Sequence, residues 1–152
     1  KDLLTKDTIK LNVEAKDWEE AVRIGGELLE KSGAIEPRYI NAMINTVKEM
    51  GPYIVIAPGI AMPHARPEAG AKKIGMSLIT LKNPVNFGNK ENDPVKIVVC
   101  LSAIDHSTHL KALSELAGLL GDEESVNKIK LADEPKTICN LLNNLQGKER
   151  RR

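Results

Sequence analysis

The sequence predicts an α/β fold, a three-layer sandwich in which helices flank a mixed, mostly five-stranded sheet. Two observations predict it. Segments with helical spacing of apolar residues occur before, between and after segments with the apolar pattern of strands. Some strand candidates are also joined by loops too short for a parallel crossover, so the sheet must contain antiparallel pairs. The length of 152 residues fits one domain with a substantial core.

The first third of the chain predicts a strand followed by two helices. Residues 8–13 alternate apolar and polar side chains, which is typical of a half-buried strand. Asp17 is a good N-cap for a helix at about 17–32. A second helix begins at Pro37, a residue favoured in the first helical turn, and ends at Gly51.

The middle third predicts the rest of the sheet. Residues 53–56 and 60–62 form short apolar strands, and residues 74–81 and 95–103 are the two strongest strand candidates. Residues 83–94 are rich in Asn, Gly and Pro, so they predict a loop with at most a short strand.

The last third predicts three helices. A short one extends from Asp122 toward Leu131. The other two are indicated by apolar residues at helical spacing, which are Leu110, Leu113, Leu116, Ala117 and Leu120 in the first, and Ile138, Leu141, Leu142 and Leu145 in the last. We expect one domain over residues 1–147, followed by a basic, disordered tail at 148–152.

Composition excludes several classes of protein. The 22 basic residues are balanced by 21 acidic residues, which argues against a general nucleic-acid binder. Aromatic residues make up only 3% of the chain, too few for the stacking platforms of single-strand binders. We see no apolar run near the length of a membrane span and no signal peptide, so we expect a cytoplasmic protein without membrane insertion. Cys100 and Cys139 belong to no metal-ligand pattern, and we expect both to be core residues.

His64 is the most informative candidate for chemistry. It follows Pro63 in a turn rich in Pro and Gly, and Pro63 makes the backbone at this point rigid. A neutral imidazole held in this way is a competent nucleophile at cytosolic pH. Arg66 and neighbouring lysines favour an anionic group there. The alternative is a turn histidine that only hydrogen-bonds a carbonyl, and these residues alone do not decide between the two.

His106 and His109 form a second feature, at the predicted start of a helix that Asp105 or Ser107 caps. A helix N-terminus disfavours the imidazolium cation and favours anions such as phosphate. The alternative is that His106 is only a solvated residue near the cap. A further alternative is a metal site made by all three histidines in a hydrolase, which no carboxylate or cysteine completes.

A longer motif around His64 carries a resemblance. Its residues are Glu49, Ile56, Ala57, Ile60, Ala61, Met62, Pro63, His64 and Ala65, with fixed gaps. The motif resembles that of the type-2 IIA components of the bacterial phosphoenolpyruvate-dependent sugar phosphotransferase system, the mannitol/fructose class. The ascorbate-type branch is the most similar, through Glu36-Pro37-Arg38-Tyr39, Gly51-Pro52-Tyr53, Pro63-His64-Ala65-Arg66-Pro67-Glu68, Asn92-Asp93-Pro94-Val95 and Thr108-His109.

The resemblance implies a function and its residues. His64 would accept a phosphoryl group from the phosphocarrier protein HPr and pass it to a cysteine of a cognate IIB protein, which serves a membrane IIC permease. His109 would lie beside His64 and stabilise the phosphoryl group. Lys48 takes the place of a phosphate-binding arginine of the wider family, and Arg66 is an alternative to it. No metal or other cofactor is implied.

The sequence leaves one alternative function open and predicts a docking surface. A regulatory module of the same family, whose phosphorylation state signals to a partner without sugar transport, has the same histidine motif. The docking surface around His64 is expected to be apolar with polar edges, with Ile60, Met62 and residues 67–71 as candidates.

Overall fold

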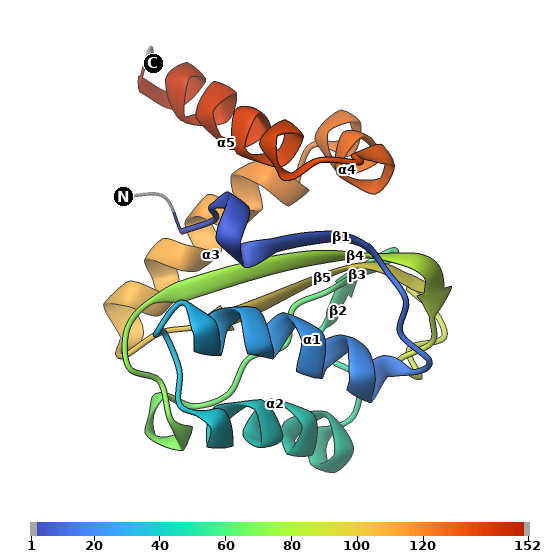
Figure 1. The fold of residues 1–152 in the computed structure, drawn as a ribbon, viewed down its shortest axis with the longest axis vertical. Coiled ribbons are helices and arrows are strands. Elements are labelled where there is room, and N and C mark those ends of the chain that lie inside the picture. Colours follow the sequence, from blue (N-terminus) through green and yellow to red (C-terminus); the bar gives the residue numbers. More distant parts are fainter. Residues whose placement is uncertain (1–2, 151–152) are drawn as a thin grey trace.

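The computed structural model describes the backbone of residues 3–150 and the side chains of residues 3–142. The elements follow one another as η1 (Lys6–Thr8), β1 (Ile9–Val13), α1 (Trp18–Lys31), α2 (Pro37–Met50), β2 (Val55–Ala57), β3 (Ile60–Ala61), η2 (Pro67–Ala69), β4 (Gly75–Val85), β5 (Val95–Ser102), α3 (His106–Leu120), α4 (Glu123–Leu131) and α5 (Pro135–Arg150), where η1 and η2 are 3₁₀ helices. Figure 1 shows their arrangement.

The strands form one mixed sheet in the order β1-β4-β5-β3-β2. β1 runs parallel to β4, and β3 runs parallel to β5. The β4–β5 and β2–β3 pairs are antiparallel. The predicted mixed sheet of five strands is therefore confirmed.

Helices cover both faces of this sheet (Figure 1). α1 and α2 lie on one face, and α3, α4 and α5 lie on the other. Successive residues of a strand point to opposite faces, so β5 supplies both cores: Val98 and Cys100 belong to the core with α1 and α2, and Val99 and Leu101 to the core with α3 to α5. This explains why β5 reads as an almost continuous apolar run.

Local signals in the sequence place α1 and α2 correctly. The carboxylate of Asp17 accepts a hydrogen bond from the backbone N–H of Glu20, as an N-cap should. Pro37 opens α2, and Gly51, with a φ of 87°, ends it. Gly25 lets α1 approach the sheet closely, since a Cβ there would lie 2.7 Å from the Sγ of Cys100. Cys100 is fully buried, as predicted, and lies in this contact.

The segment 83–94, predicted as a loop with at most a short strand, begins with the end of β4. β4 continues to Val85, which pairs with Val95 of β5. The ladder is irregular between Thr80 and Val85, and this irregularity accommodates Pro84. Pairing with the neighbouring strand thus outweighs the local preference of Asn and Pro for a loop.

The apolar face predicted for the helix at 110–120 is shifted in the structure. Ala112, Leu116 and Leu119 are the buried residues of α3, whereas Leu110 is exposed. The stripe of α3 that packs in the core is rotated from the predicted one, because Ala112 and Leu119 are buried where Leu113 and Leu120, one residue later, are only partly buried. Leu110 directly follows His109 at the pocket described below.

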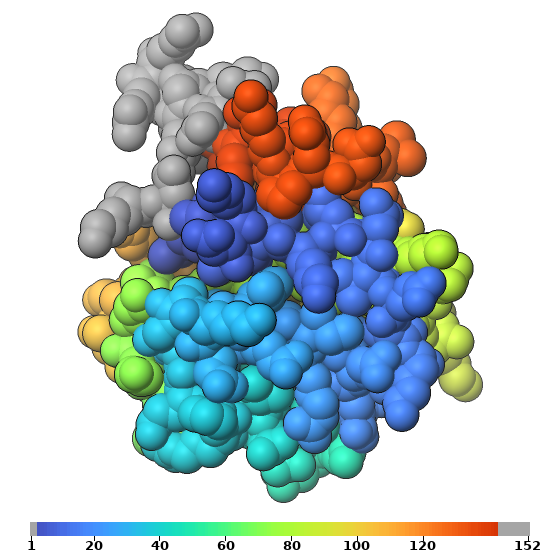
Figure 2. Space-filling model, in the orientation of Figure 1, coloured from blue at the N-terminus to red at the C-terminus, as the bar shows by residue number. Residues whose placement is uncertain are grey.

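The N-terminal segment runs along the surface between α1 and α5, as Figure 2 shows in dark blue. α5 extends to Arg150. The disordered tail predicted at 148–152 falls on residues whose side chains lie outside the described part, and it stays a prediction. No helix among the described residues is both long enough and apolar enough to cross a membrane.

Candidate phosphoryl-transfer site

His64 follows the end of β3, where proline interrupts the parallel pairing with β5. Proline has no N–H group, so Pro63 cannot donate the next bond of the ladder. The carbonyl of Pro63 still accepts a hydrogen bond from the N–H of Leu101, at 3.0 Å. On the other side, the N–H of Met62 donates to the carbonyl of Ile54, at 2.8 Å. The backbone that leads into His64 is therefore held from both neighbouring strands.

One hydrogen bond assigns the protons of the half-buried imidazole of His64. Its Nδ1 lies 2.9 Å from the carbonyl oxygen of Met62. A carbonyl oxygen only accepts, so Nδ1 is the donor and carries the proton of the neutral ring. The lone pair is then on Nε2. The two interpretations of His64 left open by the sequence are thus compatible, because the bond to a carbonyl is also what prepares Nε2 as a nucleophile.

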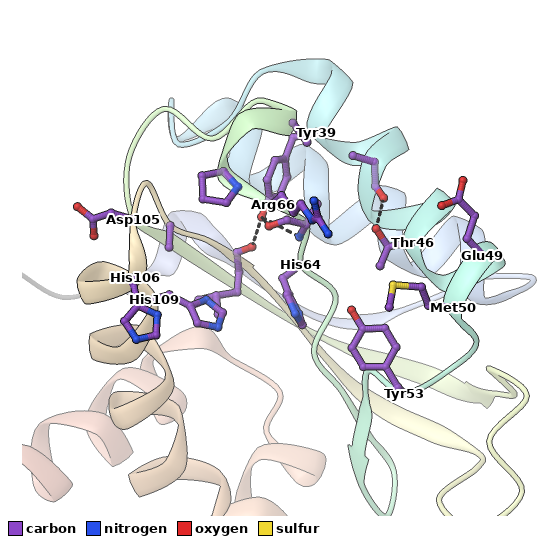
Figure 3. Close-up of a pocket in the computed structure, with 16 residues that line it drawn as sticks. Tyr39, Thr46, Glu49, Met50, Tyr53, His64, Arg66, Asp105, His106 and His109 are labelled. Carbon is purple, nitrogen blue, oxygen red and sulfur yellow. Dashed lines mark hydrogen bonds between the residues drawn. The ribbon is translucent and has the colours of Figure 1, made fainter.

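A capped helix start presents the second histidine. The carboxylate of Asp105 accepts from the N–H of Thr108 at 2.8 Å, and the hydroxyl of Thr108 accepts from the N–H of Asp105 at 3.2 Å. This reciprocal pair is a capping box, and it fixes the first turn of α3. His109 lies in that turn, with its ring centroid 5.8 Å from the ring centroid of His64 (Figure 3).

The surroundings of His109 favour its neutral form. Partial burial lowers the pKa of His109 below 6.5, and the nearby His64 and His106 lower it further. A neutral imidazole can still donate one N–H to an anion. The structure thus places beside the ring of His64 a second ring that is favoured in its neutral form and is able to donate a hydrogen bond.

A pocket of about 700 Å³ opens in front of the two histidines. One wall belongs to α2 and the residues that follow it, the opposite wall to the start of α3, and the segment after β3 lies between them (Figure 3). The ring of Tyr53 meets the ring of His64 edge-on, with centroids 6.1 Å apart. The lining residues are Tyr39, Ala42, Thr46, Glu49, Met50, Tyr53, His64, Ala65, Arg66, Pro67, Ala69, Leu101, Ala103, Asp105, His106 and His109.

The two predicted cations have different places. Arg66 is exposed and lines the pocket, two residues after His64. Lys48 is not among the lining residues, and its ammonium pairs instead with the carboxylate of Glu19 on α1, at 3.0 Å. Arg66 therefore lines the same pocket as the two histidines, whereas Lys48 does not.

Sequence reasoning missed the α2 wall of the pocket. Tyr39, Thr46 and Met50 line it, and none of the three was proposed as a site residue. Their spacing of seven and four residues puts them on one side of a helix, which is the signal that was available. That signal says nothing about which side of α2 meets His64.

The apolar surface around the pocket also differs from the expectation. Ile60 and Met62 are buried, because β3 is an inner strand of the sheet, so they cannot form a docking surface. The exposed apolar side chains at the pocket are Met50 and Tyr53, with 70% and 48% of their surface accessible. Ile104 and Leu110, next in sequence to Asp105 and His109, are also exposed.

The three histidines do not form a metal cluster. Among the side chains of residues 3–142, no group of three or more His, Cys, Asp or Glu is arranged to hold a metal ion. His106 is exposed and lines the same pocket as His64 and His109. The geometry therefore gives no support to a three-histidine metal site.

Comparison with known proteins agrees with this geometry. Residues 2–145 match the family model "Phosphoenolpyruvate-dependent sugar phosphotransferase system, EIIA 2". The ascorbate-specific PTS system EIIA component of Escherichia coli (strain K12) is 42% identical over 141 residues, which cover 92% of each chain.

Solved structures are similar as well. The mannitol-specific cryptic phosphotransferase enzyme IIA CmtB of Escherichia coli has a TM-score of 0.84 and 37% identity, over 93% of this chain and 96% of that one. The complex of enzyme IIAMTL with phosphorylated enzyme IIBMTL, also from Escherichia coli, matches with a TM-score of 0.82 and 28% identity, over 93% of this chain and 97% of the matched chain.

The match extends over nearly the whole length of both the chain and its relatives, and Glu49, His64 and Ala65 of the motif line the pocket. The chain therefore belongs to the type-2 EIIA family of the phosphoenolpyruvate-dependent sugar phosphotransferase system, a family of phosphotransferases.

Proposed function

We propose that this chain is a single-domain phosphoryl carrier, in which His64 accepts a phosphoryl group from phospho-HPr and passes it to a cysteine of a cognate IIB protein. The observation that carries the proposal is the hydrogen bond between Nδ1 of His64 and the carbonyl of Met62. It leaves the lone pair on Nε2 of a ring that lines the pocket together with His109, the two ring centroids being 5.8 Å apart.

The first step exchanges one nitrogen–phosphorus bond for another. Nε2 of His64 attacks the phosphorus in line, the bond between phosphorus and the donor histidine of HPr breaks, and the donor leaves with its electron pair. Nδ1 of His64 keeps its proton and its bond to Met62 throughout. The positive charge that develops on the ring is stabilised by the carbonyl dipole of Met62.

The second step moves the phosphoryl group to sulfur. The cysteine thiolate of IIB attacks the phosphorus, the bond to Nε2 breaks, and His64 leaves as a neutral imidazole. No proton has to be supplied to the leaving nitrogen, because Nδ1 already holds the proton of the neutral ring. The site can therefore return to its starting state without a separate acid.

Charge stabilisation comes from groups fixed before the reaction. His109 donates an N–H to a phosphoryl oxygen, and its lowered pKa keeps the resting pocket free of an extra cation there. The N-terminal turn of α3 faces the pocket with its positive dipole end. Arg66 supplies a guanidinium able to grip two oxygens at once.

Both partners are proteins, and they must reach the same nitrogen in turn. The exposed Met50 and Tyr53 on one side, and Ile104 and Leu110 on the other, give an apolar border for transient docking. Through IIB, the carrier serves a membrane IIC permease from the cytoplasm. It makes no contact with nucleic acid and does not insert into the membrane.

L-Ascorbate is the sugar we propose for the system. The support is the identity of 42% to an ascorbate-specific EIIA component over 92% of the chain. The carrier itself does not bind the sugar. It would serve one sugar only through its choice of IIB partner.

The test uses phosphoenolpyruvate labelled in its phosphoryl group, with enzyme I and HPr. We expect one acid-labile phosphate per chain, on Nε2 as identified by the nitrogen–phosphorus coupling in NMR, and none on His64→Ala. His106→Ala is the matched control, since it removes an exposed histidine of the same pocket. Labelling of His64→Ala would refute the assignment.

A second experiment tests which IIB protein accepts the phosphoryl group, and thereby which sugar system the chain serves. The labelled chain is mixed with an ascorbate-specific IIB or a mannitol-specific IIB, each with a variant that lacks the active cysteine. We expect faster transfer to the ascorbate-specific protein and none to the cysteine variants. A labelled chain that transfers to neither would favour the regulatory role that the sequence left open.

A further inference from the structure

Tyr39 is a buried residue of the pocket to which the mechanism above assigns no role. It lies in the first turn of α2, and none of its surface is accessible. Its hydroxyl oxygen lies 3.0 Å from the backbone nitrogen of Ala65 and 2.9 Å from the carbonyl oxygen of Leu101. A third backbone atom, the carbonyl oxygen of Ala65, is 3.1 Å away (Figure 3).

The chemistry of these neighbours assigns the direction of each bond. The N–H of Ala65 can only donate, so the hydroxyl oxygen accepts from it. The single hydroxyl proton then goes to a carbonyl, and Leu101 is the nearer of the two. Burial raises the pKa of Tyr39 to about 12, so the phenol keeps this proton at any physiological pH.

The register of the neighbouring strands shows what the Tyr39 hydroxyl replaces. β3 and β5 are parallel and pair Ile60 with Ile97 and Ala61 with Val98. The same offset pairs His64 with Leu101. A parallel pair at that point has two bonds, from the N–H of Leu101 to the carbonyl of Pro63 and from the N–H of Ala65 to the carbonyl of Leu101.

The first of these bonds is present, at 3.0 Å. At the place of the second, the N–H of Ala65 donates to the Tyr39 hydroxyl, which donates in turn to the carbonyl of Leu101. The hydroxyl is thus inserted into the ladder beside His64. It separates the chain after His64 from β5 by the width of one oxygen atom while keeping both backbone groups bonded.

We propose that Tyr39 is a positioning residue: its hydroxyl, inserted between Ala65 and Leu101, sets the distance of the His64 segment from β5 and thereby aims the imidazole of His64 at the pocket. The same hydroxyl ties this segment to the end of β5, which leads into α3 and His109. Tyr39 therefore couples the positions of the two histidines. The part of this proposal that concerns phosphoryl transfer rests on the function proposed for His64.

Removing this one oxygen atom has a defined consequence. In Tyr39→Phe, either Ala65 closes onto Leu101 in a direct bond, or two buried backbone groups lose their partner. Either change moves the His64 backbone. We expect phosphoryl transfer from HPr to slow by about 10- to 100-fold, because reaction rates are sensitive to displacements of about 1 Å.

Ser77→Ala is the matched control. Ser77 is also fully buried, and its hydroxyl donates to the carbonyl of Gly25 at 2.7 Å, between β4 and α1. It is not among the residues that line the pocket. We expect it to lower the melting temperature about as much as Tyr39→Phe, with the transfer rate unchanged.

Nitrogen NMR of the imidazole supplies a readout that does not depend on transfer. In the wild type, His64 should show one tautomer with its proton on Nδ1, and in Tyr39→Phe a mixture of tautomers or a shifted Nδ1 resonance. A wild-type spectrum and rate in Tyr39→Phe would overturn the proposal, as would an equal slowing in Ser77→Ala.

One measurement on the unaltered chain covers the case in which Tyr39→Phe does not fold. The hydroxyl proton of Tyr39 should exchange slowly with solvent and show a nuclear Overhauser effect to the amide proton of Ala65. Absence of that contact would overturn the proposal. If instead His64 never accepts phosphate, the proposed function fails, while these spectra still decide whether Tyr39 positions the ring.

Discussion

The two histidines of the pocket are held in different ways. The backbone around His64 is bonded to strands on both sides, and its ring is bonded to the carbonyl of Met62. His109 takes its place from the capped first turn of α3, and burial beside other histidines disfavours its cation. The first arrangement selects a tautomer, and the second selects a charge state.

If His64 is the nucleophile and His109 the stabilising group, as proposed, this difference suits each ring to its own task. A nucleophile needs its lone pair on a defined atom, which a hydrogen bond to the other ring nitrogen provides. A group that stabilises charge needs to be present and able to donate without holding a strong charge of its own. Three measurements test this division.

The largest effect is expected for His109→Ala. If His109 donates to the phosphoryl group in the transition state, the rate of acceptance from HPr should fall about 10²- to 10³-fold, as on the loss of one oxyanion donor. Rapid-quench measurement of labelled phosphate gives the rate, and nitrogen NMR should show the tautomer of His64 unchanged. A rate within a factor of two or so of wild type would mean that the two histidines do not share the reaction.

An intermediate effect is expected for Arg66→Gln, with Lys48→Gln as its control. Arg66 accompanies His64 on the rigid segment and lines the pocket, so its loss should slow transfer about tenfold, the lower end for a charged hydrogen bond. Lys48 pairs with Glu19 at the surface, so its replacement should leave the rate unchanged and lower the free energy of unfolding by less than about 1 kcal/mol. A larger slowing in Lys48→Gln than in Arg66→Gln would show that the phosphate-binding cation is Lys48 on α2.

The smallest effect concerns the charge state of His109. Burial, His64 and His106 lower its pKa below 6.5, so the neutral form is favoured in the fold. Stability tied to this group is complete above the unfolded pKa, near 6.5, and is lost as the pH falls below it. His106→Asn removes one of the groups that lower the pKa of His109. That pKa should therefore rise, and the protein should lose less stability as the pH falls.

Proton NMR titration of the His109 ring checks this result in both proteins. Because burial is the largest cause, the pKa should stay below 6.5 in His106→Asn. A wild-type pKa at or above 6.5 would show that the pocket does not select a neutral His109, and the contrast with His64 would then fail.

Much of the fold and part of the site could be predicted from local patterns. The caps at Asp17 and Asp105, the helix start at Pro37 and the strand end at Pro63 each depend on a residue and its near neighbours. The motif around His64 lies within the short segment 49–65, so it identified the nucleophile candidate and, by resemblance, the neighbouring His109. These features are encoded within a few residues, which is why a single sequence reveals them.

Several features that the sequence did not predict depend on distant contacts. Strand pairing extended β4 to Val85, and the stripe of α3 that meets the sheet left Leu110 exposed. The role of Lys48 was expected from the family resemblance; in the structure Lys48 pairs with Glu19, whereas Thr46 and Met50 line the pocket with His64. No spacing rule fixes how a helix is rotated against a particular neighbour.

The sequence by itself determined the elements, the family and the nucleophile candidate, since each rests on short-range geometry or on a motif within a short segment. Only the tertiary structure decided which nitrogen of His64 bears the lone pair and which backbone groups the Tyr39 hydroxyl contacts. The physical reason is that hydrogen bonds require atoms to lie about 3 Å apart. For Tyr39 and Leu101, 62 residues apart in sequence, only the packing of α2 against the end of β5 brings those atoms together.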